Sequence, residues 1–331
     1  MKKLHILITL LIICLIVMAI FSGTSVLSIG VGTYEHADQY RAGDTTVTSA
    51  VENLEVDWTE GALNIVFHEG SGIAVSETAK KTLTDDTRLH WWLDGATLRI
   101  HYAKSGLIIN ENLEKKLTIS LPEGLVLNKA DIGGTSADII ISALAADDMI
   151  LGSTSGDIRA LVAAKKLNAS STSGSLDITQ RGGSDSVTLH STSGSVNASL
   201  EDVKVISLSS TSGSVTLIQA GEAESVTLHS TSGSVRAENV NARKADAAST
   251  SGSVTVLMDA LYDLHVSSTS GTVTATLPAT PGFTCKVSTA SGSFNSAIAL
   301  NKDGDTYSCG DGSGSVKLET ASGNIRILEK K

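Results

Sequence analysis

Two histidines, His190 and His229, each stand immediately before a Ser-Thr-Ser-Gly tract, which brings together the residue types of a serine hydrolase. A catalytic triad needs one unique serine with an oriented base, whereas here the serines recur in every period. The recurrence indicates a scaffold, and we expect these side chains to project outward from windings two apart. At about 9 to 10 Å, they are too far apart to share a zinc ion with bonds of about 2.0 to 2.1 Å. We therefore predict no catalytic residues and no metal ligands.

A second candidate for chemistry is the acidic segment 301–306, which is followed by Gly310-Asp311-Gly312 and is similar in composition to a calcium loop. An EF-hand loop has glycine at its sixth position and glutamate at its twelfth, and counting from Asn301 neither is present. The segment is therefore predicted to be a solvated turn, and no cofactor is expected.

Two cysteines, Cys285 and Cys309, lie beyond the N-terminal apolar segment, where disulfides persist if the chain is exported. One hypothesis is a disulfide that pins the insertion near residues 300–314 to the last windings. The alternative is a buried free thiol. The sequence leaves both open.

The element that must position all these residues is an internal repeat. A Ser-Thr-Ser-Gly tract recurs with little change, and its first seven glycines follow one another at intervals of 18 to 20 residues. Such regular spacing, with a turn signal in each period, is typical of a solenoid. The glycines predicted to mark the repeat turns are Gly156, Gly174, Gly194, Gly213, Gly233, Gly252, Gly271, Gly292 and Gly323.

Apolar residues alternate with a period of two on both sides of each glycine, for example at Val187 and Leu189 before Gly194. This is the pattern of strands. The fold class predicted is all-β, a single-stranded β-helix with coils of about 19 residues whose strands pair with the coils above and below. We expect glycine at the corner because it adopts positive φ, and we expect the serine and threonine hydroxyls to bond to the turn backbone.

Lys2 and Lys3 precede an uncharged run from Ile6 to Ile29. Its 24 residues would extend about 36 Å as a helix, against a hydrocarbon core of about 30 Å. The lysines predict that the N-terminus stays in the cytoplasm and that the rest of the chain is extracytoplasmic. A cleaved signal peptide is the alternative, because Gly23-Thr24-Ser25 offers a small-residue cleavage site.

Four parts are therefore predicted along the chain. Residues 1–32 are a transmembrane signal-anchor or signal peptide, and 33–50 are a linker. Residues 51–140 are the N-terminal coils and cap, and 141–328 are the regular Ser-Gly repeats with an insertion near 300–314.

Composition narrows the possible partners. The net charge of −10 and the lack of a Lys/Arg cluster exclude a nucleic-acid binder. No aromatic residue lies between Tyr102 and Tyr262, so aromatic platforms for a glycan could come only from Trp91, Trp92 and Tyr102. The exposed file of threonines beside the glycines raises an ice-binding alternative. We do not favour it, because a corner is too narrow for the required flat array.

Leu54-Glu55-Val56-Asp57-Trp58, Leu117 to Pro122, the Ser-Gly repeats and the ending Thr320 to Ile325 resemble, in this order, the bacterial putative-adhesin family of β-strand repeat proteins. The resemblance covers about residues 50 to 328. It implies a β-helix on a bacterial cell surface behind an N-terminal membrane segment, without enzymatic activity. It also implies a link to envelope stress systems.

The function predicted is that of a non-catalytic, extracytoplasmic surface module, held at the cell membrane by its N-terminal helix or secreted if the signal is cleaved. The partner expected is an envelope protein or a glycan. Two alternatives stay open, a polysaccharide-acting β-helix enzyme and an accessory domain of an envelope stress response system. Nothing in the sequence defines the oligomeric state.

Overall fold

The computed structural model describes residues 31–107 and 113–331. The predicted N-terminal membrane helix lies outside these residues. Within them no helix is long and apolar enough to cross a membrane, and the helical element is a single 3-10 turn, η1 (Ala37–Gln39). The described chain is otherwise built of strands, so the all-β prediction is confirmed.

The strands divide into an N-terminal part and a regular part. The N-terminal strands are β1 (Arg41–Ala42), β2 (Thr45–Val47), β3 (Asn53–His68), β4 (Ile73–Thr78), β5 (His90–Asp94), β6 (Thr97–His101), β7 (Lys116–Pro122) and β8 (Val126–Ser153). The remaining strands are β9 (Ile158–Ser171), β10 (Leu176–Gln180), β11 (Ser184–Ser191), β12 (Val196–Glu201), β13 (Val203–Ser210), β14 (Val215–Ala220), β15 (Ala223–Ser230), β16 (Val235–Ser249), β17 (Val254–Ser268), β18 (Val273–Leu277), β19 (Gly282–Thr289), β20 (Phe294–Ser296), β21 (Asn301–Asp303), β22 (Thr306–Gly310), β23 (Gly314–Thr320) and β24 (Ile325–Glu329).

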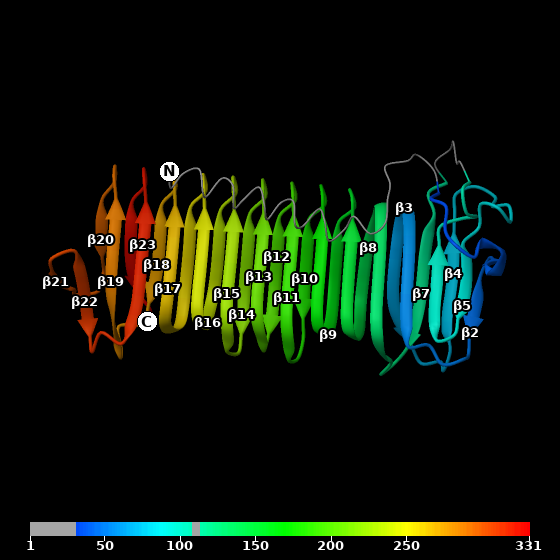
Figure 1. The fold of residues 1–331 in the computed structure, drawn as a ribbon, viewed down its shortest axis with the longest axis horizontal. Coiled ribbons are helices and arrows are strands. Elements are labelled where there is room, and N and C mark those ends of the chain that lie inside the picture. Colours follow the sequence, from blue (N-terminus) through cyan, green and yellow to red (C-terminus); the bar gives the residue numbers. More distant parts are fainter. Residues whose placement is uncertain (1–30, 108–112) are drawn as a thin grey trace.

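Successive windings stack through two parallel sheets, which gives the elongated body seen in Figure 1. In one sheet β10 pairs with β9 and β12, so that Leu176 lies between Ile158 and Val196. In the other sheet β11 pairs with β13, which places Val187 beside Ile206. The alternating apolar columns of both sheets are buried, and they form one continuous core along the stack.

The corner between the two sheets is held by the first serine of each Ser-Thr-Ser-Gly tract. Ser210 Oγ donates to the carbonyl of Gly194 in the preceding winding at 2.9 Å and accepts from the amide of Gly213 in its own winding at 2.9 Å. The same pair of bonds recurs along the stack, for instance at Ser230. The predicted bonds to the turn backbone are therefore present for these serines, and each buried hydroxyl satisfies backbone groups of two windings at once.

The reason expected for glycine at these corners is wrong. None of the nine corner glycines has a positive φ. What excludes a side chain is the stacking itself, because a Cβ on Gly213 would lie 2.6 Å from the amide nitrogen of Ser195 and closer still to the carbonyl of Gly194. Alanine is therefore excluded at these corners because the backbone of the neighbouring winding is too close. The φ angle of the corner residue itself does not exclude it.

At both ends the order in space differs from the order along the chain. β3 lies between β8 on one side and β6 and β7 on the other. At the opposite end β23 lies between β17 and β19, and β24 lies between β18 and β20. A simple β-helix, in which each coil pairs with the coils before and after it along the chain, is therefore not what the two ends show. The alternation of apolar residues determines which face of a strand is buried. It does not determine which other strand pairs with it.

Antiparallel strands cover the open edges of the N-terminal end. β5 pairs with β6, β4 pairs with β7, and β1 and β2 then pair with β5 and β4. At the other end, the insertion near 300–314 forms the hairpin β21–β22, and β22 pairs with β19. Covered edges protect a parallel stack against pairing with further chains.

Residues 33–50, predicted as a linker, are part of this N-terminal cap. They contain η1, β1 and β2, and Thr45–Val47 pairs with Ile73–Val75. The segment looks like a linker because it is polar and short in apolar residues. Its order comes from the sheet edge that it covers.

Candidate functional site

The N-terminal cap carries a cluster of aromatic rings at its surface, which we call the cap aromatic cluster: Tyr34, His36, Tyr40, Trp92 and His101. The rings of Tyr34 and His101 are stacked, with centroids 3.9 Å apart and planes 1° from parallel. Trp92 meets Tyr40 edge-on at 5.6 Å and His36 at 5.6 Å. Tyr34, Tyr40, Trp92 and His101 are half-buried, and His36 is exposed.

Two elements position these rings. Trp92 and His101 come from the β5–β6 hairpin, in which Trp92 lies opposite Arg99. Tyr34 and Tyr40 come from the segment around η1, and the Tyr34 amide and hydroxyl bond to Ser105 Oγ at 3.0 Å and to the Ala103 carbonyl at 3.1 Å. The cluster therefore joins residues that lie about 60 positions apart.

The two adjacent tryptophans face opposite ways, as strand alternation requires. Trp91 packs against the core and has the guanidinium of Arg41 over its ring at 5.7 Å. Trp92, in contrast, does not pack against the hydrophobic core. Tyr102, also named from sequence as a platform residue, is 1 % exposed and meets Trp58 in a T-shaped pair at 4.8 Å. Of the three aromatic residues proposed for a platform, Trp92 alone lies in the cluster.

Charged side chains surround the rings. Arg99 forms an ion pair with Glu55 and lies 3.4 Å from an oxygen of Asp94. Asp57, whose side chain is 65 % exposed, lies 3.7 Å from His101 Nδ1. Burial raises the pKa of both Tyr34 and Tyr40 to about 12, so that each hydroxyl keeps its proton. The surface thus combines ring faces with hydrogen-bonding groups of both kinds.

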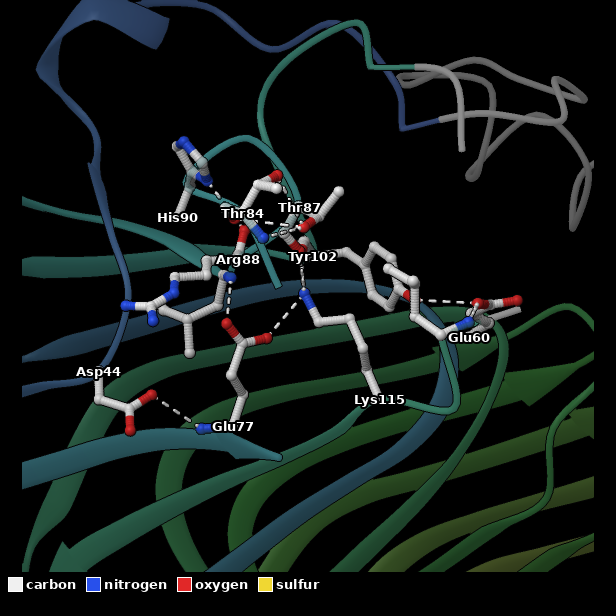
Figure 2. Close-up of polar contacts among 11 residues, drawn as sticks. Asp44, Glu60, Glu77, Thr84, Thr87, Arg88, His90, Tyr102 and Lys115 are labelled. Carbon is white, nitrogen blue, oxygen red and sulfur yellow. Dashed lines mark hydrogen bonds and ion pairs between the residues drawn. The ribbon is translucent and has the colours of Figure 1, made fainter. Parts of the chain in front are cut away.

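Beneath the cap surface lies a buried lysine, Lys115, shown in Figure 2. Its Nζ forms an ion pair with Glu77 Oε2 at 2.7 Å, and the two side chains are 0 % and 3 % exposed. Nζ also donates to the carbonyls of Thr87 at 2.7 Å and Tyr102 at 2.5 Å. The ammonium lies 4.2 Å from the ring centre of Tyr102 and 4.9 Å from that of Trp58.

Further hydrogen bonds fix the partners of Lys115 in place. Glu77 Oε1 accepts from the amide of Leu89 at 2.7 Å, and Tyr102 donates its hydroxyl to Glu60 at 2.9 Å. Burial lowers the pKa of Lys115, and the Glu77 carboxylate opposes this shift. Because the lysine is enclosed and its partners are close, we interpret the group as the structural centre of the cap and not as a reactive amine.

A hollow in the surface lies beside this group. This hollow of about 400 Å³ is lined by Glu60, Gly61, Ala62, Glu114, Lys115, Lys116 and Ser136. Among the described residues no group of three or more His, Cys, Asp and Glu side chains is placed to hold a metal ion.

The two histidines named from sequence lie at the same register position on one sheet, with one strand between them. Ser209 separates His190 from His229, which are two windings apart, as predicted. His190 Nδ1 is 2.9 Å from Ser209 Oγ, so a serine and a histidine do meet. Burial lowers the pKa of both histidines. No carboxylate is bonded to His190 among the described residues, and the arrangement serves as a contact between windings.

Comparison with known proteins identifies the family. The family model Toastrack DUF4097 matches residues 51–197 and 163–328, which together cover most of the chain. The chain belongs to the DUF4097 toastrack family. No curated protein matches it.

The solved structures that the chain matches include a "putative cell adhesion protein" from Clostridium sporogenes, with 14 % identity, coverage of 88 % of this chain and 100 % of that chain, and a TM-score of 0.20. A "putative adhesin" from Bacteroides fragilis shows 14 % identity, coverage of 90 % and 100 %, and a TM-score of 0.32. A "putative lipid binding protein" from Parabacteroides distasonis shows 15 % identity, coverage of 88 % and 97 %, and a TM-score of 0.38.

A charged network that the sequence did not reveal links three windings of this toastrack chain. His265 on β17 contacts Asp246 of β16 through Nδ1 at 3.1 Å and Glu319 of β23 through Nε2 at 3.1 Å. Lys317 lies 2.8 Å from the same carboxylate of Glu319. Glu319 lies on the winding that fits between its two neighbours out of chain order, so the network ties this winding to the stack.

We expect this network to make stability depend on pH. The hydrogen bond to Asp246 raises the pKa of His265 above its ordinary value of 6.5. The stabilisation is therefore complete below the unfolded pKa and is lost as pH rises through the folded pKa. His265→Asn should cost more free energy of unfolding at pH 5.5 than at pH 8, by under about 1 kcal/mol because the groups are partly exposed.

His229 provides the matched control, because burial lowers its pKa. Its neutral form is favoured in the fold, so protonation on acidification opposes folding, and His229→Asn should show the opposite trend. Urea titrations of both variants at the two pH values make the comparison. Equal costs of His265→Asn at both pH values would contradict the expected linkage.

The two cysteines of the toastrack's last windings are both free in the structure, Cys285 buried and Cys309 half-buried. Antiparallel pairing sets Cys285 opposite Tyr307 and Cys309 opposite Phe283, so the cysteines are diagonal neighbours. Diagonal positions are about 7 to 8 Å apart, whereas a disulfide needs Cβ atoms about 3.5 to 4.5 Å apart. The register therefore favours free thiols, the alternative that the sequence left open.

Peptide mapping without reductant is expected to find Cys285 and Cys309 each alkylated after denaturation. In the native protein Cys309 should be labelled first, because burial raises the pKa of Cys285 to about 12 and excludes the reagent. A disulfide-linked pair of peptides containing both residues would show that the strands shift in register.

Proposed function

We propose that this toastrack chain is a non-catalytic, extracytoplasmic β-solenoid that is held at the bacterial cell membrane and binds a component of the envelope. The observation that carries the proposal is the cap aromatic cluster. It places half-exposed rings and charged groups together on a chain whose repeats present mainly serine, threonine and isolated charges.

The rest of the fold supports a scaffold role. Windings of about 19 residues, joined by parallel pairing and buried corner bonds, give a long body with small side chains along its length. The apolar run from Ile6 to Ile29, with Lys2 and Lys3 before it, supports a membrane anchor. Val31 is already buried in the cap, so an anchor would hold the cap close to the membrane surface.

The experiment that tests this function uses the full chain with an affinity tag after Lys331, expressed in a bacterial host. Cross-linking of intact cells followed by capture is expected to retain an envelope component, and protease added to protoplasts should remove the tag. Trp92→Ala should lose the captured component, and Tyr262→Ala, which alters an exposed ring far from the cap, should keep it. A tag protected from protease would contradict the proposed topology, and an empty capture would contradict binding.

A further inference from the structure

The surface rings of the cap do not all serve its packing. Trp91 and Tyr34 pack against the hydrophobic core, whereas Trp92 and Tyr40 do not. Trp92 and Tyr40 instead contact one another edge-on, and Tyr40 also adjoins the Tyr34–His101 stack. Both side chains are half-buried, and the part of each ring that stays exposed is available to a ligand.

The groups around these rings define what such a ligand must be. The carboxylates of Glu55, Asp57 and Asp94 outnumber the one guanidinium among them, and Arg99 is already paired with Glu55 and Asp94. An anionic ligand would meet net repulsion from these carboxylates. Carboxylates accept hydrogen bonds from hydroxyl groups, and the Tyr40 hydroxyl keeps its proton and can donate.

The neighbourhood of the cluster argues against a protein partner. The large apolar side chains that are exposed in the described structure are Val126, Ile140, Leu161, Val205, Ile218, Tyr262 and Leu328. None of them belongs to the cluster. Protein interfaces usually surround aromatic anchors with further apolar contacts that exclude water, and here the surrounding groups are charged.

We propose that the cap aromatic cluster is a binding site for an uncharged glycan, with a pyranose ring placed against Trp92 and Tyr40. The C–H face of the sugar would cover the ring faces, while its hydroxyls would donate to Asp57 and Asp94. This assignment rests on the proposed function and names the ligand class for the same surface.

Titration of the full-length protein with defined oligosaccharides tests the site. The protein is kept in a zwitterionic, sugar-free detergent, and chitohexaose, cellohexaose and a hexagalacturonate are added separately while tryptophan fluorescence and calorimetry are recorded. At least one uncharged hexasaccharide is expected to bind saturably, and the hexagalacturonate is expected not to bind. Absence of saturable binding by both uncharged sugars would overturn the assignment.

Variants locate the binding on the molecule. Trp92→Ala and Tyr40→Ala should each weaken binding at least tenfold, and Tyr262→Ala should leave it unchanged. Asp57→Ala alters an exposed side chain and is expected to leave the fold intact. Its expected loss of affinity therefore still tests the site if a ring variant unfolds. Binding that persists in Trp92→Ala and Asp57→Ala would place the sugar elsewhere. If an envelope protein is captured while no sugar binds, the proposed function stands and the glycan site is wrong.

Discussion

Gly213→Ala is expected to lower the free energy of unfolding by about 3 kcal/mol, the upper end of typical overpacking costs. A Cβ there would meet the carbonyl group of Gly194 and, at 2.6 Å, the amide nitrogen of Ser195. These are backbone atoms of the preceding winding, so they have no rotamer through which to move away. Relief requires two windings to separate, which also breaks the corner bonds of Ser210.

The matched control for this change is Gly152→Ala, in β8 of the same stack. Nothing lies within 4 Å of a Cβ at Gly152, and its φ is not positive. Alanine there should be neutral or stabilising by up to about 1 kcal/mol, because it reduces backbone freedom in the unfolded chain. Guanidinium titrations of the two variants provide the comparison, and similar midpoints would refute the close-approach argument.

Hydrogen exchange adds a spatial test of the same substitution. In a repeat protein each winding is stabilised mainly by its immediate neighbours. The loss of amide protection in Gly213→Ala should therefore be greatest in the windings around Gly194, Gly213 and Gly233 and should decline toward the two caps. A uniform loss along the whole chain would indicate that the damage lies in the unfolded state or in a global change of the stack.

The repeats show what a sequence can fix and what it cannot. The inward columns at Val187 and Leu189 follow from alternation alone, because a strand buries every second residue, and both are fully buried. The order of windings at the ends does not follow, since β3 and β23 carry the same alternating stripe as their neighbours. Which winding β3 or β23 pairs with depends on how the connecting segments fit together in three dimensions.

The sequence likewise predicted one part of the candidate site and not the other. Trp91 and Trp92 had to face opposite sides because they are adjacent in a strand, and the structure assigns Trp92 to the surface cluster. Tyr34 and Tyr40 stood in a segment predicted as a linker. Their aromatic character was the one available signal, and nothing local indicated that this segment would cover the edge of β5.

Lys115 is the residue whose role the sequence least revealed. A lysine beside Glu114 and Lys116 is typical of a solvated turn. In the structure its carbonyl faces Gly61 at the start of the corner column that continues through Ala137 to Gly156. The Lys115 side chain is enclosed in the cap, where Glu77 matches its charge.

Lys115→Met is expected to cost about 3 to 5 kcal/mol, the range for breaking a buried ion pair by removing one partner. Methionine fills similar volume, so the loss comes mainly from Glu77, which would remain 3 % exposed without the cation 2.7 Å away. The carbonyls of Thr87 and Tyr102 would lose their donor as well. Lys104→Met, which breaks an exposed pair with Asp86 in the same cap, should change stability little.

The double variant Lys115→Met with Glu77→Gln separates the charge from the packing. Glutamine keeps the acceptor for the amide of Leu89 and carries an amide that can donate to the freed carbonyls, while the buried charge is gone. The double variant should therefore be more stable than Lys115→Met alone, as measured by urea unfolding. If the two were equally unstable, the cost would lie in the lost contacts of the ammonium with Trp58 and Tyr102, and the ion pair would not be what secures the cap.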